Sequence, residues 1–328
     1  MLTLDLIRLA IGLVVLYAGA EALVRGSASM ARAFGVKPLI IGLTVVAYGT
    51  SAPELAVSTK AALDHAQPIA LGNVIGACAA NISLVLGLTA LIAPPTVDRR
   101  LIRREVPILL ASVIAVPLCL LDGVISRVEG GLLVACAVMF TIATLTFSAR
   151  DVDLGDDEEG REAALERLGA AVGGRARPRA SRAGALVLAS VGLLLIVVGS
   201  DQFVAGARGL AAEVGLSERL LGLTVIALGT SLPELIASLA AATRHQSGLA
   251  VGSVIGSNLL NVFLVLGLVA YLRPIGIGDR VHAVDVIGLL VITLLGVVVL
   301  RGSRTISRAE GLMLIGAYLA FLVCAAIF

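Results

Sequence analysis

An internal repeat is the feature that most constrains the fold of this chain. Shifted by 180 residues, GLTVVAYGTSAPEL (42–55) matches GLTVIALGTSLPEL (222–235) at 11 of 14 positions. With the same shift, GNVIGACAANISLVLGL (72–88) matches GSVIGSNLLNVFLVLGL (252–268) at 10 of 17 positions. Because both blocks align in one register, we interpret the chain as two copies of one unit.

Long apolar runs place both copies in a membrane. The chain is 58% hydrophobic and 15% charged, whereas a soluble domain carries roughly 25% charged residues. A helix needs about 20 apolar residues to cross the hydrocarbon core. The runs that meet this length lie near 5–24, 38–60, 68–93, 105–122, 129–148, 184–204, 218–240, 247–272, 284–301 and 309–328.

The number of spans sets the relation between the two copies. Each copy has five of the ten spans. Because five is an odd number, the second copy enters the membrane from the opposite side, which is an inverted repeat typical of transporters. We therefore predict an all-α integral membrane protein with ten transmembrane helices in two inverted five-helix repeats. The repeats cover 1–148 and 184–328, and 149–183 forms a cytoplasmic linker. The run at 5–24 has a counterpart at 184–204, which argues against a cleaved signal peptide.

The distribution of positive charge predicts the orientation. The loops between spans 1–2, 3–4, 5–6, 7–8 and 9–10 hold 18 of the 25 Lys and Arg residues, and the opposite face holds the other 7. Positive loops face the cytoplasm, so we expect both termini outside an inner (plasma) membrane. The 149–183 segment begins acidic and ends basic, which favours a solvated linker over a cation site. A net charge of +2 without basic clusters argues against a nucleic-acid partner.

Each copy places a proline and a glutamate side by side within its second span, at Pro53–Glu54 and Pro233–Glu234. A charge at mid-membrane costs at least about 2.5–3.5 kcal/mol, so it needs a compensating partner. Inverted symmetry brings the two glutamates together near the midplane. Two facing carboxylates repel unless a cation or a proton lies between them. A protonated structural carboxyl is the alternative role for each glutamate.

Oxygen atoms surround this pair in the sequence. Each proline frees a carbonyl about one turn earlier, and the neighbouring hydroxyls are those of Thr50, Ser51, Thr230 and Ser231. Hard cations such as Ca2+ and Na+ prefer such oxygen ligands. The third span of each copy adds Asn81 or Asn261, and its glycines (Gly72, Gly76, Gly252 and Gly256) allow close helix contact. We expect discontinuous helices 2, 3, 7 and 8 around a midplane ion site. An interhelical hydrogen bond is the alternative role for both asparagines.

GTSAPE and GTSLPE, followed by GNVIG…N and GSVIGSNLLN, resemble the paired signature repeats of the cation/Ca2+ antiporter superfamily, in particular prokaryotic sodium/calcium exchangers. The resemblance covers essentially the whole chain. It implies a transporter rather than an enzyme, which exchanges Na+ for Ca2+ by alternating access, needs no cofactor and functions as a monomer in the lipid bilayer. It also implies that the first and sixth spans slide across the core, with Glu21 and Asp201 at interfacial positions.

The same resemblance implies a role for each site residue. Ca2+ lies between Glu54 and Glu234, with backbone oxygens at Thr50 and Thr230. The Na+ sites use Ser51, Ser231, the carbonyls of Ala47 and Ala227, and the Ser257 hydroxyl. Asn81 and Asn261 line the centre.

Three positions depart from the family pattern. Ala77 and Cys78 stand where a serine and an asparagine are expected, and position 261 is Asn where some relatives carry an acidic residue. The loss of a hydroxyl at position 77 leaves the counter-ion open, so a Ca2+/H+ antiporter on the same fold is the main alternative. An intramembrane hydrolase and a passive channel are further alternatives. The first lacks an accompanying His or Ser–Lys dyad, and the second requires no counter-ion.

Overall fold

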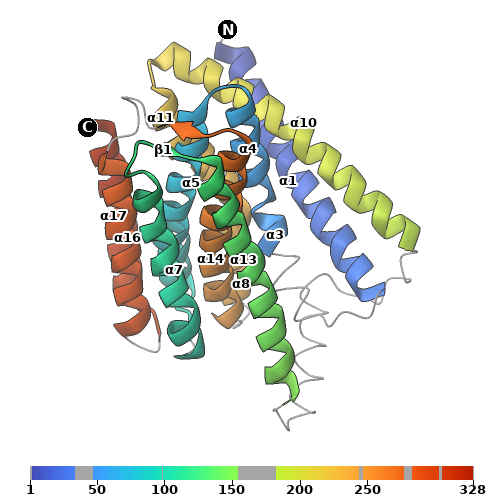
Figure 1. Cartoon of the computed structure of the whole chain (residues 1–328), viewed down its shortest axis with the longest axis vertical. Helices are drawn as coiled ribbons and strands as arrows, with labels where there is room; N and C mark the ends of the chain where they lie inside the picture. The colour runs from blue at the N-terminus through green and yellow to red at the C-terminus, as the bar shows by residue number, and fades with distance from the viewer. Residues whose placement is uncertain are drawn as a thin grey trace.

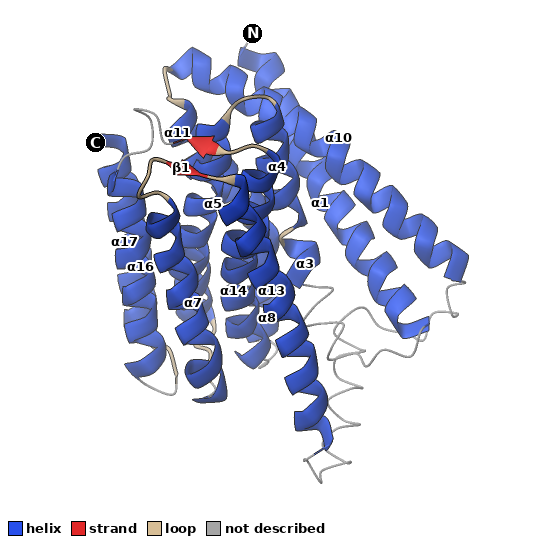
Figure 2. Ribbon diagram, viewed as in Figure 1, coloured by secondary structure: helices blue, strands red, loops and turns tan. Residues whose placement is uncertain are grey.

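The computed structural model describes residues 2–33, 47–97, 99–153, 182–243, 247–276, 283–302 and 305–327. These residues form a helical bundle with one small two-stranded sheet, as Figure 2 shows. The strands are β1 (Val124–Ile125) and β2 (Ile275–Gly276), paired antiparallel. Most of the predicted linker, residues 154–181, lies outside the described residues, as do residues 34–46 at the start of the second predicted span.

Among the described residues, eight helices are long and apolar enough to cross a membrane. They correspond to eight of the ten predicted spans. Of the other two, the 38–60 span is described only from residue 47, and the 105–122 span lies in α7 (Arg99–Cys119), whose first turns carry arginines. The count of ten and the inversion of the repeat stay predictions.

Helices α1 (Leu2–Ala33) and α10 (Arg182–Val214) form a close pair that is inclined to the rest of the bundle (Figure 1). Glycines recur every seven residues on both helices. A Cβ atom added at any of them would lie less than 3.0 Å from backbone atoms of the partner helix. These glycines are Gly12, Gly19, Gly26, Gly192, Gly199 and Gly206. Their missing side chains therefore allow the two backbones to touch along most of the pair.

The second span of each copy is interrupted. Helix α3 (Ala47–Thr50) ends before Ser51, and α4 (Ala52–Leu63) begins after it. In the second copy α11 (Glu218–Leu221), η3 (Gly222–Ile226) and α12 (Ala227–Thr230) lead to Ser231, and α13 (Leu232–Thr243) follows. The two serines have almost the same backbone angles, φ −83° and ψ 2° at Ser51 and φ −82° and ψ 2° at Ser231. A proline in the first turn of α4 and of α13 explains both breaks.

The third span of each copy runs unbroken, so the predicted discontinuity of helices 3 and 8 is wrong. In the first copy α5 (Gln67–Ala79), η2 (Ala80–Val85) and α6 (Leu86–Ile92) form one helix. In the second copy α14 (Ser247–Leu260), η4 (Asn261–Leu266) and α15 (Gly267–Leu272) do the same. Neither stretch has a proline beyond its first turn, so no backbone hydrogen bond is removed. Each helix instead widens into a π turn, a feature that is frequent at functional sites.

The remaining helices are α7, α8 (Arg127–Asp153), α16 (Ala283–Gly302) and α17 (Arg308–Ile327). A buried ion pair connects α11, α16 and α17. One guanidinium nitrogen of Arg219 lies 2.7 Å from Asp285 Oδ1, and the other donates to the Ala325 carbonyl at 2.6 Å. Leaving either charge without its partner would be strongly destabilising, so these three helices are held together at this end.

Candidate cation site

The two interrupted helices place their glutamates at equivalent points. Glu54 is the third residue of α4 and Glu234 the third residue of α13, so both lie in a first turn, where the helix dipole favours negative charge. Glu54 is 0% exposed and Glu234 1% exposed. The two carboxyl groups are close enough for their charges to interact. The structure therefore brings together the two acidic side chains that the repeat predicts.

Each carboxyl group faces hydroxyl residues of the other copy. Ser231 Oγ donates a hydrogen bond to Glu54 Oε1 at 3.3 Å, and the Thr230 side chain lies beside it. The side chains of Thr50 and Ser51 lie around the Glu234 carboxyl group in the same way. Ser257, from the third span of the second copy, completes this group. The site is thus built across the boundary between the copies.

Many of the oxygens at this site have no hydrogen-bond partner. Among the described residues, neither Glu234 oxygen has one, nor does Glu54 Oε2. The hydroxyls of Ser51 and Ser257, beside Glu234, also lack one. The side-chain amides of Asn81 and Asn261, in the third span of each copy, are likewise buried without a partner in the described part of the chain. A buried polar atom without a partner costs about 1–3 kcal/mol, and more when it is charged. A set of buried oxygens in this state suits a cation as their common partner.

Two further predicted residues lie four residues before the serines that interrupt the second spans. Ala47 is the first described residue of α3, and Ala227 directly continues η3 into α12. The Ala227 carbonyl already accepts from the Ser231 backbone N–H at 3.0 Å and from the Thr230 hydroxyl at 3.3 Å. Ala77 is fully buried and has no side-chain oxygen, whereas its counterpart Ser257 lies at the Glu234 carboxyl group. The two copies therefore contribute unequally to the site.

Two buried asparagines, Asn73 and Asn258, were not singled out from the sequence. Asn73 bonds to residues of both copies, and Asn258 Nδ2 donates to the Cys78 carbonyl at 3.1 Å. A usable signal existed for Asn73. It lies eight residues before Asn81, in the middle of an otherwise mostly apolar helix, where a polar side chain needs a hydrogen-bond partner.

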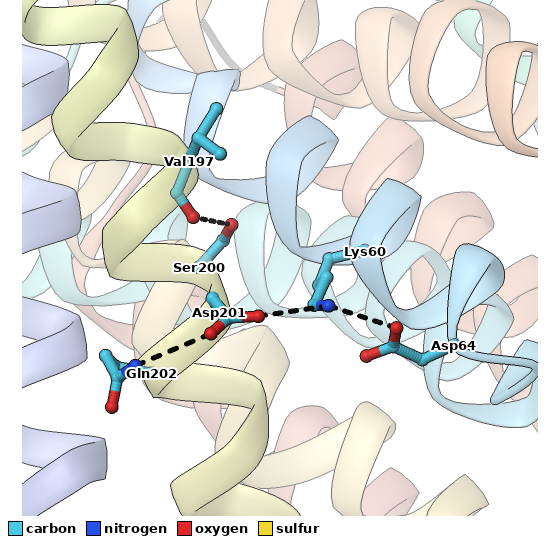
Figure 3. A network of polar contacts seen from close by, with 6 residues as sticks. All are labelled: Lys60, Asp64, Val197, Ser200, Asp201 and Gln202. Atoms are coloured by element: carbon cyan, nitrogen blue, oxygen red, sulfur yellow. Dashed lines mark hydrogen bonds and ion pairs between the residues drawn. The ribbon is translucent and has the colours of Figure 1, made fainter.

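Glu21 and Asp201, which the resemblance places at interfacial positions, lie at exposed positions. Lys60 Nζ on α4 lies 3.0 Å from Asp201 Oδ1 on α10 and 3.0 Å from Oδ1 of Asp64, which directly follows α4 (Figure 3). Glu21 pairs instead with Arg25 on its own helix. The position equivalent to Lys60 in the second copy is Ala240. The ion pair between the core and the α1–α10 pair therefore occurs in one copy only.

A cavity of about 970 Å³ lies between parts of α10 and α4. Lys60 and Asp201 line it together with Tyr48 and Ser51, so the same space borders both the ion pair and the site. Most of its other lining residues are apolar, among them Leu55, Ile196 and Leu264.

A helical membrane bundle with a buried, carboxylate-centred oxygen site defines a class of protein, the membrane transporters for cations. The chain belongs to the sodium/calcium exchanger protein family, whose model matches residues 4–146 and 184–326. Membership and fold together assign it to the cation/Ca2+ antiporters.

Three relatives illustrate the similarity. The chain is 34% identical to inner membrane protein YrbG of Escherichia coli over 96% of this chain and 94% of that protein. It is 29% identical to sodium/calcium exchanger MaX1 of Methanosarcina acetivorans over 98% of this chain and 99% of that protein. The structure of the sodium-calcium exchanger NCX_Mj soaked with 10 mM Na+ and 10 mM Sr2+ matches with a TM-score of 0.67 at 33% identity, over 98% of this chain and 99% of that one.

Proposed function

We propose that this protein exchanges Na+ for Ca2+ across the inner membrane by alternating access. The observation that carries the proposal is the pair of buried carboxyl groups, Glu54 and Glu234, each facing hydroxyl residues of the other copy. One divalent ion or several monovalent ions can balance two carboxylates, but both sets cannot do so at once. Exchange follows from this competition if the protein cannot switch between its outward- and inward-facing states while the site is empty and both carboxylates are charged.

The proposed ligands follow the placement of the residues. Ca2+ binds between Glu54 and Glu234, with carbonyl oxygens at Thr50 and Thr230. Na+ ions bind around it, at Ser51, Ser231 and Ser257 and at the carbonyls of Ala47 and Ala227, while Asn81 and Asn261 line the centre. The unpartnered oxygens of Glu234, Ser51 and Ser257 support these assignments. No resident cofactor enters this mechanism, and one chain supplies every proposed ligand, so the protein functions as a monomer.

The proposed orientation puts both termini outside and the 149–183 linker in the cytoplasm, between the repeats 1–148 and 184–328. The two ends of the described chain lie at the same end of the bundle, which supports an even number of spans (Figure 1). In this orientation the Lys60–Asp201 ion pair lies on the outer side. The cavity between α4 and α10 gives the α1–α10 pair room to move against the core.

Coupling to H+ is the second candidate for the counter-ion. Ala77 supplies no hydroxyl where the second copy has Ser257, so one expected Na+ ligand is missing. In that mechanism Glu54 or Glu234 takes a proton when Ca2+ leaves.

Purified full-length protein in liposomes separates these functions. We expect Ca2+ uptake to saturate with Ca2+ and to require a Na+ gradient, with the pH equal on both sides. Uptake driven only by a pH gradient would assign H+ as the counter-ion. Uptake that neither saturates nor needs a counter-ion would identify a channel and refute the antiporter.

A further inference from the structure

Asn73 on α5 connects the two copies beside the proposed Ca2+ site. Its side chain is fully buried. Its Nδ2 donates to Ser58 Oγ on α4 at 2.8 Å and points to the Glu54 carbonyl at 3.5 Å. Its Oδ1 accepts from the Thr230 hydroxyl at 3.2 Å. One amide group therefore holds the helix that carries Glu54 and the end of α12 in the other copy.

Two of the three residues that Asn73 contacts, Glu54 and Thr230, belong to the proposed site. The bonds to α4 restrain the first turns of that helix, from which the Glu54 carboxyl group projects. Thr230 supplies one of the proposed carbonyl ligands, and its hydroxyl is shared between Asn73 Oδ1 and the Ala227 carbonyl. Asn73 is thus placed to fix the distance between ligands that come from different copies.

The equivalent position in the second copy is not used in this way. It carries Ser253, whose hydroxyl donates to the Ala250 carbonyl of its own helix at 3.0 Å. The counterpart of Ser58 is Ser238, which bonds to Thr89 at 3.1 Å and to the same Ala250 carbonyl at 3.3 Å. Within the described part of the chain, the bridge between α4 and α12 has no equivalent at Ser253. The pair Asn73 and Ser253 therefore offers a matched comparison.

We infer that Asn73 is a positioning residue that sets the Ca2+ affinity and the size preference of the cation site. The inference rests on the proposed Ca2+ site at Glu54, Glu234 and Thr230. Ca2+–oxygen distances span only about 2.3–2.6 Å, so a shift of a few tenths of an ångström in one ligand favours a cation of another size. Without the Asn73 amide, Thr230 and α4 are no longer held at one separation, and the site tolerates the larger Sr2+ better.

The test compares Asn73→Ala with Ser253→Ala in liposomes, using Ca2+ and Sr2+ as separate substrates. We expect Asn73→Ala to raise the half-saturating Ca2+ concentration about tenfold, the effect of losing one or two net hydrogen bonds. The maximal rate should change much less, and the ratio of Ca2+ to Sr2+ affinity should fall. Ser253→Ala should keep both quantities within about twofold, because its bond lies within one helix. A general loss of folded protein would lower the maximal rates of both ions without changing the ratio.

A second variant tests the same bond if Asn73→Ala does not fold. Thr230→Val removes the same Thr230–Asn73 bond while the Asn73 bond to Ser58 stays, and it should lower the same ratio. An unchanged Ca2+ affinity and Ca2+/Sr2+ ratio in whichever of these variants folds would overturn the inference about Asn73. The proposed antiport would still stand in that case, provided that the wild-type protein exchanges Ca2+. Wild-type protein that transports no Ca2+ under any gradient would overturn both.

Discussion

Replacing either glutamate by glutamine tests the carboxylate pair directly. Glutamine has nearly the shape of glutamate but no charge. In Glu54→Gln the amide oxygen can still accept from Ser231, so the fold around the site should survive. Because Glu54 is 0% exposed and Glu234 1% exposed, water cannot replace the lost charge.

The size of the effect follows from this burial. Removing one partner from a buried charge interaction costs about 3–5 kcal/mol. At about 1.4 kcal/mol per factor of ten, we expect Ca2+ affinity to fall by roughly 100-fold to 4,000-fold in either variant. Exchange at submillimolar Ca2+ should then be abolished.

The assay is Ca2+ uptake into Na+-loaded liposomes as a function of external Ca2+, with Glu21→Gln as the control. The Glu21 side chain is 44% exposed and pairs only with Arg25 among the contacts of the described chain, so its loss should cost less than about 1 kcal/mol. Wild-type half-saturation in Glu54→Gln or Glu234→Gln would refute the carboxylate cage. Equal loss in the Glu21 variant would show that the charge effect is not specific to the site.

Three other changes probe the gate, the counter-ion and the helix pair. Lys60→Ala should shift the balance of outward- and inward-facing states by about fivefold or less, because an exposed ion pair contributes at most about 1 kcal/mol. The measurement is the Ca2+ affinity from each side of the membrane, with Asp201→Asn as the companion variant. Affinities equal to those of the wild type would show that the ion pair has no such role. Ala77→Ser should lower the half-saturating Na+ concentration by restoring the hydroxyl that Ser257 supplies in the other copy, and no change would point to another counter-ion. Gly199→Leu should reduce thermal stability in detergent by forcing α1 and α10 apart, at a cost of roughly 1–3 kcal/mol, and an unchanged unfolding temperature would contradict the close contact.

The breaks in the second span of each copy could be predicted because proline acts locally. Pro53 and Pro233 remove a backbone hydrogen bond wherever the chain folds, so Ser51 and Ser231 adopt non-helical angles in both copies. The prediction failed for the third span, because small residues and asparagine do not force a break, and the chain forms π turns there without interrupting the helix. The roles of individual ligands stay predictions.

The partners of polar side chains were harder to predict than the pairing of the glutamates. The repeat was enough to predict that Glu54 and Glu234 lie together, whereas Asn73 meets Thr230 through the packing of α5 against α12, across 157 residues of sequence. The Lys60–Asp201 ion pair could not be predicted from the sequence for the same reason. The repeat suggests equal copies, and this contact has no counterpart at Ala240.

The seven-residue spacing of glycines on α1 and α10 limits how these helices can shift along each other. Seven residues of helix span about 10.5 Å, so the next alignment of glycines with the partner backbone is that far away. Any smaller slip would drive the bulkier side chains between them, such as Leu16 and Ile196, into the facing backbone. If the helix pair moves during the proposed exchange, we expect displacements of a few ångströms to carry both helices as one rigid rod, with the shear at the surface that faces α4.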